Sequence, residues 1–348
     1  MSHRTRAVAC IILALPVVLL FAGCSGASVT FAFGPSDQSL KPVTVARDAT
    51  ASNASPAVAQ IDLTGLIADR QSFDLLGGGT NPVNEFVVRL ARAGEDPAVR
   101  AVVLRSNSPG GTVAAADTLY DELVRFRESS GKPVVISLGE VAASGGYYTA
   151  LAADEIVAQP STLTGSIGVI IPTVNVSSGL TRLGIDARSI TSGPNKDLAN
   201  PLEPRRAEHD AILQDIVAQF YAAFKAKVTA HRTGVSPARL DALTDGRILT
   251  GADAHEAGLV DHVGDVRFAF ERAKSLAGLS DARLIKYLYE DSNRPRSPYS
   301  PTAAAPTNTP AASNVNVNTG LQFSLDNPLA TLGPLQPTPH YLWLPVAP

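Results

Sequence analysis

Two glycine-rich segments hold the residues best suited to chemistry. Ser144 stands in the motif Ala-Ala-Ser-Gly-Gly, and residues 107–111 read Asn-Ser-Pro-Gly-Gly. Small neighbours leave a serine hydroxyl accessible, and paired glycines let backbone N–H groups approach a developing negative charge. Each segment also has an ordinary explanation, because serine is a common helix N-cap and Pro-Gly-Gly is a common turn.

A serine nucleophile needs a base that removes its proton. The six histidines lie outside glycine-rich and strand-end segments, which leaves a lysine as the remaining candidate. Lys196 follows the turn-rich residues Thr-Ser-Gly-Pro-Asn, and burial is what lowers the pKa of a lysine toward neutrality. From the sequence alone, a solvated loop lysine is the favoured interpretation of Lys196.

The elements that must position these residues alternate between strands and helices. Apolar runs at 101–105 and 133–138 predict buried strands directly before the two glycine-rich segments. Helical spacing of apolar residues predicts helices at 113–128, 144–153 and 208–231. This alternation predicts an α/β domain with largely parallel strands. The other expected elements are strands at 58–63, 156–158 and 167–171 and a helix at 82–92.

The N-terminal residues 1–23 have the pattern of a signal peptide. Two arginines precede an apolar run, which ends in Leu-Phe-Ala-Gly-Cys24 and resembles a bacterial lipobox. This predicts lipidation of Cys24. An ordinary secretory signal and an uncleaved membrane anchor are the alternatives. All three interpretations export the rest of the chain.

Composition divides the exported part into three. Residues 24–56 are small and polar and are predicted to be a tether, and residues 57–289 carry the strand and helix patterns. Residues 290–348 contain 11 of the 25 prolines and are predicted to be a disordered tail.

Charge and cysteine content exclude several functions. The formal net charge is −3, so no basic field points to nucleic acid. Both cysteines lie in the first 24 residues, which leaves the body without a disulfide framework or a thiolate metal site. No metal-binding helix motif or phosphate loop is evident, so we expect neither a metal nor a cofactor.

Five motifs occur in a specific order along the body. They are Ser-Pro-Gly-Gly at 108–111, Ala-Ser-Gly-Gly-Tyr-Tyr at 143–148, Thr-Gly-Ser-Ile-Gly-Val at 164–169, Gly-x-x-Lys-Asp at 193–197 and a closing segment at 246–261. This set resembles the signal peptide peptidase A family, which is serine peptidase family S49, in its short single-repeat form. The resemblance implies an α/β fold of the Clp protease/crotonase type, built from repeated β-β-α units with a C-terminal helical segment.

The resemblance also implies roles for individual residues. Ser144 matches the family nucleophile and Lys196 matches the general base of a Ser/Lys dyad. Ser166 matches a serine that orients the lysine. The backbone amides of Gly111 and Gly145 match the oxyanion hole.

The implied function is that of a membrane-associated serine endopeptidase. Its expected substrates are remnant signal peptides or other short apolar peptides, and its expected location is the outer face of a bacterial cytoplasmic membrane. The family also implies a homo-oligomer. Two other classes remain open: a crotonase-fold acyl-transfer enzyme, and a membrane scaffold without catalytic activity. Asn195 departs from the aromatic residue that family members often carry before the lysine.

Overall fold

The computed structural model describes residues 39–71, 81–289, 297–300, 302 and, for the backbone, 340–342. All of them belong to one compact unit. The predicted signal peptide, Cys24 and most of the predicted tail lie outside the described residues. Among the helices in the described ranges, none is long and apolar enough to cross a membrane.

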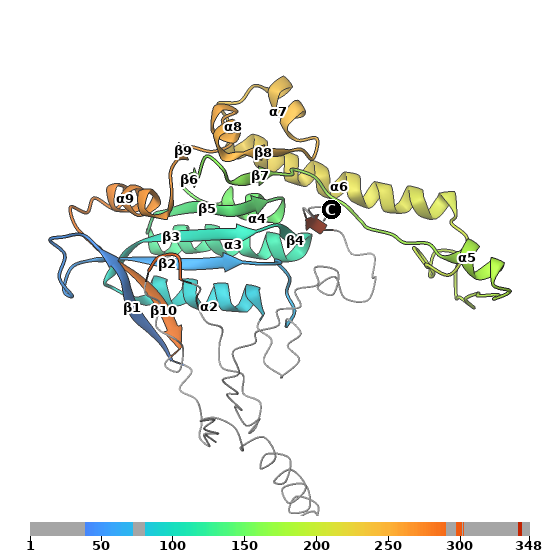
Figure 1. Ribbon diagram of the computed structural model, residues 1–348, viewed down its shortest axis with the longest axis horizontal. Helices are drawn as coiled ribbons and strands as arrows, with labels where there is room; N and C mark the ends of the chain where they lie inside the picture. Colours follow the sequence, from blue (N-terminus) through green and yellow to red (C-terminus); the bar gives the residue numbers. More distant parts are fainter. Residues whose placement is uncertain (1–38, 72–80, 290–296, 301, 303–339, 343–348) are drawn as a thin grey trace, which may run out of the picture. The chain divides into compact units, whose positions relative to one another are not determined.

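A mixed sheet forms the centre of the described unit (Figure 1). Its nine strands lie in the order β1-β10-β2-β3-β5-β6-β9, with β7 beside β5 and β8 beside β7. Neighbours are parallel except for β1 with β10 and β7 with β8. The predicted α/β class is therefore confirmed. The strands are β1 (Leu40–Arg47), β2 (Ala57–Thr64), β3 (Val99–Ser108), β4 (Gly110–Thr112), β5 (Val134–Ala143), β6 (Glu155–Ala158), β7 (Leu163–Gly165), β8 (Ile248–Thr250), β9 (His262–Val263), β10 (Arg283–Tyr289) and β11 (His340–Leu342).

The helices begin and end where local chemistry predicts. The first one described is α2, whose cap Asn81 accepts hydrogen bonds from two backbone N–H groups and precedes a proline. Gly131 ends α3 in the left-handed conformation, with a φ of 65°. The helices are α2 (Pro82–Glu95), α3 (Val113–Ser130), α4 (Gly145–Ala150), α5 (Ser177–Arg182), α6 (Ala207–His231), α7 (Pro237–Leu243), α8 (Gly251–Glu256) and α9 (Val266–Leu276).

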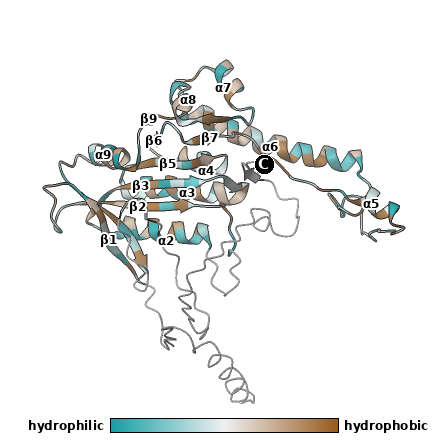
Figure 2. Ribbon diagram, viewed as in Figure 1, coloured by the Kyte–Doolittle hydropathy of each residue, from teal (hydrophilic) through white to brown (hydrophobic). Residues whose placement is uncertain are grey.

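Alternate residues of the central strands face opposite sides of the sheet. In β3, Val102 and Leu104 belong to the core shared with α2, α3 and α4, whereas Ala101 and Val103 belong to the core shared with α9. Helices therefore cover both faces of these strands, which explains their continuous apolar runs. Figure 2 shows the matching pattern on α2, where brown and teal residues alternate around the helix.

The connections bring the two glycine-rich segments to one edge of the sheet. Helix α2 joins β2 to β3 and α3 joins β3 to β5, and these three strands are parallel neighbours. Their carboxyl ends therefore lie at the same edge, where ligands bind in parallel α/β sheets. The strand β4 follows β3 there, and Ser144 follows β5. Strands β3 and β4 with α3 form one β-β-α unit of the implied kind.

Two expectations at the ends of the domain differ from the structure. The strand β1 lies inside the predicted tether 24–56, yet it pairs antiparallel with β10 along its length. Only the short run Val43–Val45 gives β1 a strand pattern, so the distant partner strand stabilises it. Residues 297–300 and 302 lie inside the predicted tail, where they contact β2 and β10 through hydrogen bonds.

Two predicted elements near the site are also corrected. The strand expected at 167–171 does not form, because β7 ends at Gly165 and Ser166 has a φ of 50°, which no strand residue adopts. The helix expected at 144–153 is the shorter α4, and Ser144 lies just before it.

Candidate active site

Ser144 occupies the sharp turn between β5 and α4. Its backbone has φ 53° and ψ −115°, a conformation that L-residues rarely adopt and that costs about 1–3 kcal/mol. Although Ser144 stands at the N-cap position, its side chain makes no capping hydrogen bond. The helix-cap explanation therefore does not account for a serine here. A strained strand-to-helix turn with a serine at its tip is the geometry that presents the nucleophile in α/β-hydrolases.

The hydroxyl of Ser144 is buried and unpaired. The residue is 1% exposed, and in the described part of the chain its Oγ has no hydrogen-bond partner. A buried polar group without a partner costs about 1–3 kcal/mol. Such a group in a native fold requires an explanation, and a role in catalysis is one.

The helix after Ser144 is anchored firmly. The Ser144 N–H donates to the Gly165 carbonyl at 2.8 Å, and the Tyr147 hydroxyl donates to the Leu259 carbonyl at 2.8 Å. Burial raises the pKa of Tyr147 to about 12, so this phenol is a neutral donor near pH 7 and not a base. Tyr148 packs edge-on against Phe224, with ring centroids 5.0 Å apart, which fixes α6 on α4.

Close backbone contacts explain the glycines around Ser144. A Cβ on Gly146 would lie 2.9 Å from the Ser108 carbonyl oxygen, and a Cβ on Gly111 would lie 1.8 Å from the carbonyl oxygen of Ile67. Ser108 also shapes the turn, since its Oγ donates to the Gly65 carbonyl at 2.6 Å and accepts from the Gly110 N–H at 3.1 Å. Sequence reasoning assigns no role to Ser108. Its position in a Ser-Pro-Gly-Gly turn is the only signal.

The backbone N–H and C=O of Gly111 face the edge of β4 opposite Ile67, where β11 pairs with β4. Ile67 pairs with β4 on one side, where its N–H donates to Gly110 and its carbonyl accepts from Thr112. Alternation along a strand turns the N–H and C=O of Gly111 the other way. Gly111 can therefore donate to a group on this edge, next to α4.

The structure brings Ser166 close to Ser144 through the backbone. Ser166 follows Gly165, which accepts the Ser144 N–H, and both serines have positive φ. The Ser166 N–H donates to the Arg247 carbonyl at 2.7 Å, and the residue is 8% exposed. Ser144, Gly145, Gly111 and Ser166 thus share one region.

Lys196 lies elsewhere, in the exposed turns between α5 and α6. Its side chain is exposed, and no hydrogen bond or ion pair among the described residues joins it to Ser144. A lysine that acts as a base needs burial, which favours its neutral form. The single chain does not provide this environment, so the pairing of Ser144 with Lys196 stays a prediction.

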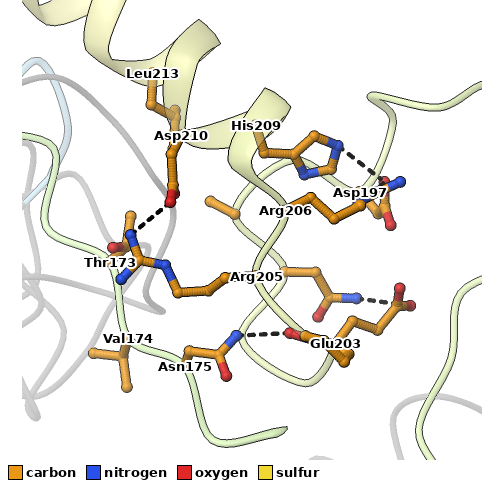
Figure 3. A pocket seen from close by; sticks show the side chains of 13 residues that line it. Thr173, Val174, Asn175, Asp197, Glu203, Arg205, Arg206, His209, Asp210 and Leu213 are labelled. Carbon is orange, nitrogen blue, oxygen red and sulfur yellow. Dashed lines mark hydrogen bonds and ion pairs between the residues drawn. The ribbon is translucent and has the colours of Figure 1, made fainter.

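The turn that carries Lys196 is held by charged residues at the start of α6 (Figure 3). Arg206 forms an ion pair with Asp197, and a ring nitrogen of buried His209 lies 2.9 Å from the Pro194 carbonyl oxygen. Desolvation opposes ionisation of Asp197, but backbone and Arg206 hydrogen bonds outweigh it and lower the pKa of this carboxyl. No local signal in the sequence marks these contacts, since Arg206 and His209 have the pattern of ordinary residues at a helix start.

Comparisons with known proteins agree with the motifs. The family model described as peptidase family S49 matches residues 126–280. The chain is 36% identical over 240 residues to "Protease 4" of Salmonella typhi. The aligned region covers 68% of this chain and 37% of that protein. The chain is 33% identical to "Putative signal peptide peptidase SppA" of Enterococcus faecium, with 66% of each covered.

Two further comparisons extend this result. The chain is 34% identical over 234 residues to "Putative protease slr0021" of Synechocystis sp., with 67% of this chain and 79% of that protein covered. A solved structure of a mutant of the "1510-N membrane-bound stomatin-specific protease" is 19% identical with a TM-score of 0.39 and covers 64% of this chain and 86% of that one, which is too distant to place residues. The relative from Synechocystis matches over most of its length, and the chain belongs to peptidase family S49.

Proposed function

We propose that this protein is a serine endopeptidase in which Ser144 is the nucleophile and Lys196 the general base. The observation that carries the proposal is the unpaired Oγ of Ser144, buried at a strained turn beside the Gly111 edge. Membership of family S49 and the Gly-x-x-Lys-Asp motif at 193–197 support the role of Lys196.

The proposed reaction proceeds through an acyl-enzyme. Neutral Lys196 takes the proton of Ser144, and Oγ attacks the scissile carbonyl. The amides of Gly111 and Gly145 stabilise the oxyanion, and one such donor contributes about 2.7–4 kcal/mol. The lysine then protonates the leaving amine, water attacks the ester, and Ser144 regains its proton. Ser166 orients the lysine.

Self-association would supply the burial that Lys196 lacks. The segment 170–202 exposes several large apolar side chains, among them Leu183 at 75% and Ile190 at 97%. Apolar surface of this extent in a folded chain marks an interaction site. We therefore include a homo-oligomer in the proposal, with this segment in the interface and Lys196 desolvated by it.

The proposed substrates are short apolar peptides such as remnant signal peptides. A nucleophile buried at the edge of the sheet is out of reach of a folded protein, whereas an extended peptide can approach it. The proposed location is the outer face of a bacterial cytoplasmic membrane, reached through the N-terminal residues 1–24. The named relatives from Salmonella and Enterococcus support a peptidase, but this chain spans only 37% and 66% of their lengths.

A fluorophosphonate probe tests the nucleophile directly. We expect the probe to label the parent once per chain, with the adduct on Ser144, and Ser144→Ala to lose both the label and peptide hydrolysis. Ser137→Ala is the matched control, because Ser137 is a buried serine in β5, the strand that leads to Ser144. Peptide hydrolysis by Ser144→Ala at the parent rate would refute the assignment. Labelling without peptide hydrolysis would favour an acyl-transfer enzyme.

A further inference from the structure

Side chains from one helix contact the turn of Lys196 on both sides of the lysine. Nε2 of His209, in the first turn of α6, lies 2.9 Å from the Pro194 carbonyl oxygen and 3.9 Å from a carboxylate oxygen of Asp197. Arg206, three residues earlier, forms an ion pair with Asp197. Figure 3 shows both side chains directed toward Asp197. The contacted residues therefore stand two positions before Lys196 and one position after it.

The hydrogen bond between His209 and Pro194 has a fixed direction. A carbonyl oxygen can only accept, so Nε2 of His209 carries the hydrogen and donates it. Because His209 is only 7% exposed, little water competes for this bond. A leucine at position 209 would leave the carbonyl without this donor, whereas the side-chain amide of a glutamine can supply an N–H.

The other described contacts of this turn are local. The N–H of Lys196 donates to the Gly193 carbonyl at 3.2 Å, and the N–H of Asn200 donates to the Asp197 carbonyl at 3.0 Å. Such bonds shape a turn but do not fix it to the rest of the fold. In the described part of the chain, the hydrogen bonds and ion pairs that join residues 193–197 to α6 come from its first residues and their cap.

The helix α6 extends from this turn to the helix that follows Ser144. Phe224 of α6 packs edge-on against Tyr148 of α4, with ring centroids 5.0 Å apart. A helix is a stiff element, so side chains at its start keep a fixed relation to the elements packed further along it. His209 therefore links the turn of Lys196 to the part of the fold that carries Ser144.

We propose that His209 is a positioning residue for Lys196, which fixes the turn of the lysine by donating to Pro194, with the Arg206 contact to Asp197 as the second anchor. This inference rests on the proposed function for the role of Lys196 as the base. Neighbouring residues must hold a catalytic group to within about 0.5 Å of its working geometry. A misplacement of about 1 Å can lower the rate about 100-fold. Since a base acts in the chemical step, its displacement lowers kcat and leaves KM unchanged.

Two substitutions of His209 separate the hydrogen bond from the bulk of the ring. His209→Leu fills the space without a donor, and we expect it to lower kcat for a short apolar peptide at least tenfold with KM unchanged. His209→Gln supplies an amide N–H and should recover most of the lost kcat. Arg205→Gln is the matched control, because it breaks an exposed ion pair with Asp210 at the same helix start and should behave like the parent. A parental kcat in His209→Leu, or no recovery in His209→Gln, would overturn the proposal.

Amide hydrogen exchange tests the position of the turn without hydrolysis. Mass spectrometry of a peptide that spans residues 193–200 follows the hydrogen-bonded amides of the turn. We expect these amides to exchange about fivefold faster in His209→Leu, the factor that corresponds to one net hydrogen bond. His209→Gln and Arg205→Gln should exchange like the parent. Parental exchange in His209→Leu would contradict the role of His209.

Two further variants keep the outcomes distinct. Arg206→Gln removes the second anchor from a side chain that is 41% exposed, so it loosens the turn without disturbing the core. We expect faster exchange and a lower kcat from it as well. Lys196→Ala tests the base itself and should abolish hydrolysis. If Lys196→Ala cleaves peptides like the parent, the proposed function fails, and the exchange rates still decide whether His209 holds the turn. If Lys196→Ala is inactive and His209→Leu is unaltered in kcat and exchange, the role of His209 alone is refuted.

Discussion

Ser144 has two energetic costs that the packing of the fold does not require. Its backbone is held at a φ of 53°, and its hydroxyl is buried without a described partner. Neither cost has a local structural benefit, since the side chain does not cap α4. Costs of this kind concentrate at functional sites, where the surrounding structure sustains them. Here that structure includes the hydrogen bond from Ser144 to Gly165 and the anchored ring of Tyr147.

The strain at Ser144 makes a prediction about stability. Ser144→Gly and Ser144→Ala both remove the hydroxyl, but only alanine keeps the Cβ that disfavours positive φ. We expect the glycine variant to have the higher free energy of unfolding by about 1 kcal/mol, because relief of about 1–3 kcal/mol outweighs the flexibility of glycine in the unfolded chain. Urea denaturation measures the difference.

Ser137, in the extended interior of β5, provides the control with the opposite sign. There Ser137→Gly should be less stable than Ser137→Ala by about 0.5–1 kcal/mol, since glycine weakens a strand. If glycine were also the less stable choice at position 144, the turn would not be strained.

At the scale of elements, the sequence predicted what local chemistry dictates. The strands and helices from β2 to α4 follow apolar runs and glycine turns, and Gly111 and Gly146 are required by contacts with nearby backbone. The strands β1 and β10 escaped prediction as a pair, because β1 is stabilised by residues more than 200 positions away. In the candidate site, too, local features could be predicted from the sequence and long-range contacts could not. Ser144 is marked by its neighbours, whereas the contacts of Asp197 with Arg206 depend on tertiary structure.

One buried charge pair joins β2 to β10, since Lys286 Nζ lies 2.7 Å from a carboxylate oxygen of Asp62. Burial lowers the pKa of Lys286, and Asp62 opposes that shift. Asp62→Asn leaves the lysine charge without compensation, which should cost about 3–5 kcal/mol of unfolding free energy at pH 7. The folded-state pKa of Lys286 then falls further below its unfolded value of about 10.4. The penalty applies below the folded pKa and shrinks as pH rises, so the deficit should narrow between pH 7 and pH 10.

Two controls isolate the buried charge from other effects of the substitution. The double variant Asp62→Leu with Lys286→Met removes both charges and should stay close to the parent. Asp245→Asn breaks an exposed pair with Arg247 and should show no change between pH 7 and pH 10, because the hydrogen bond from Arg247 lowers the pKa of Asp245 to about 2. A deficit in Asp62→Asn that is equal at both pH values would show that Lys286 is not the cause.

At the scale of the whole molecule, the two parts of the proposed site differ in how well they are buried. Ser144 and the glycine turns rest on a covered parallel sheet, while Lys196 lies in turns whose apolar neighbours face solvent. A sheet with helices on both faces is stable without a partner, but an exposed segment with side chains such as Ile190 gains from being covered. Assembly is therefore the step that the proposed chemistry requires.

This requirement gives the last prediction. Leu183→Glu combined with Ile190→Glu places two charges on the exposed segment and should lower the sedimentation coefficient, because charged side chains are unfavourable in the core of an interface. Peptide hydrolysis should fall at least tenfold with it, since Lys196 would stay in water and lack the buried surroundings that a lysine base needs. The far-UV circular dichroism spectrum should not change, because both side chains are exposed and contribute little to packing within the chain. Val88→Glu, on the exposed face of α2, is the matched control and should preserve sedimentation and activity. If the double variant sediments and cleaves peptides like the parent, assembly through this segment is not what buries Lys196.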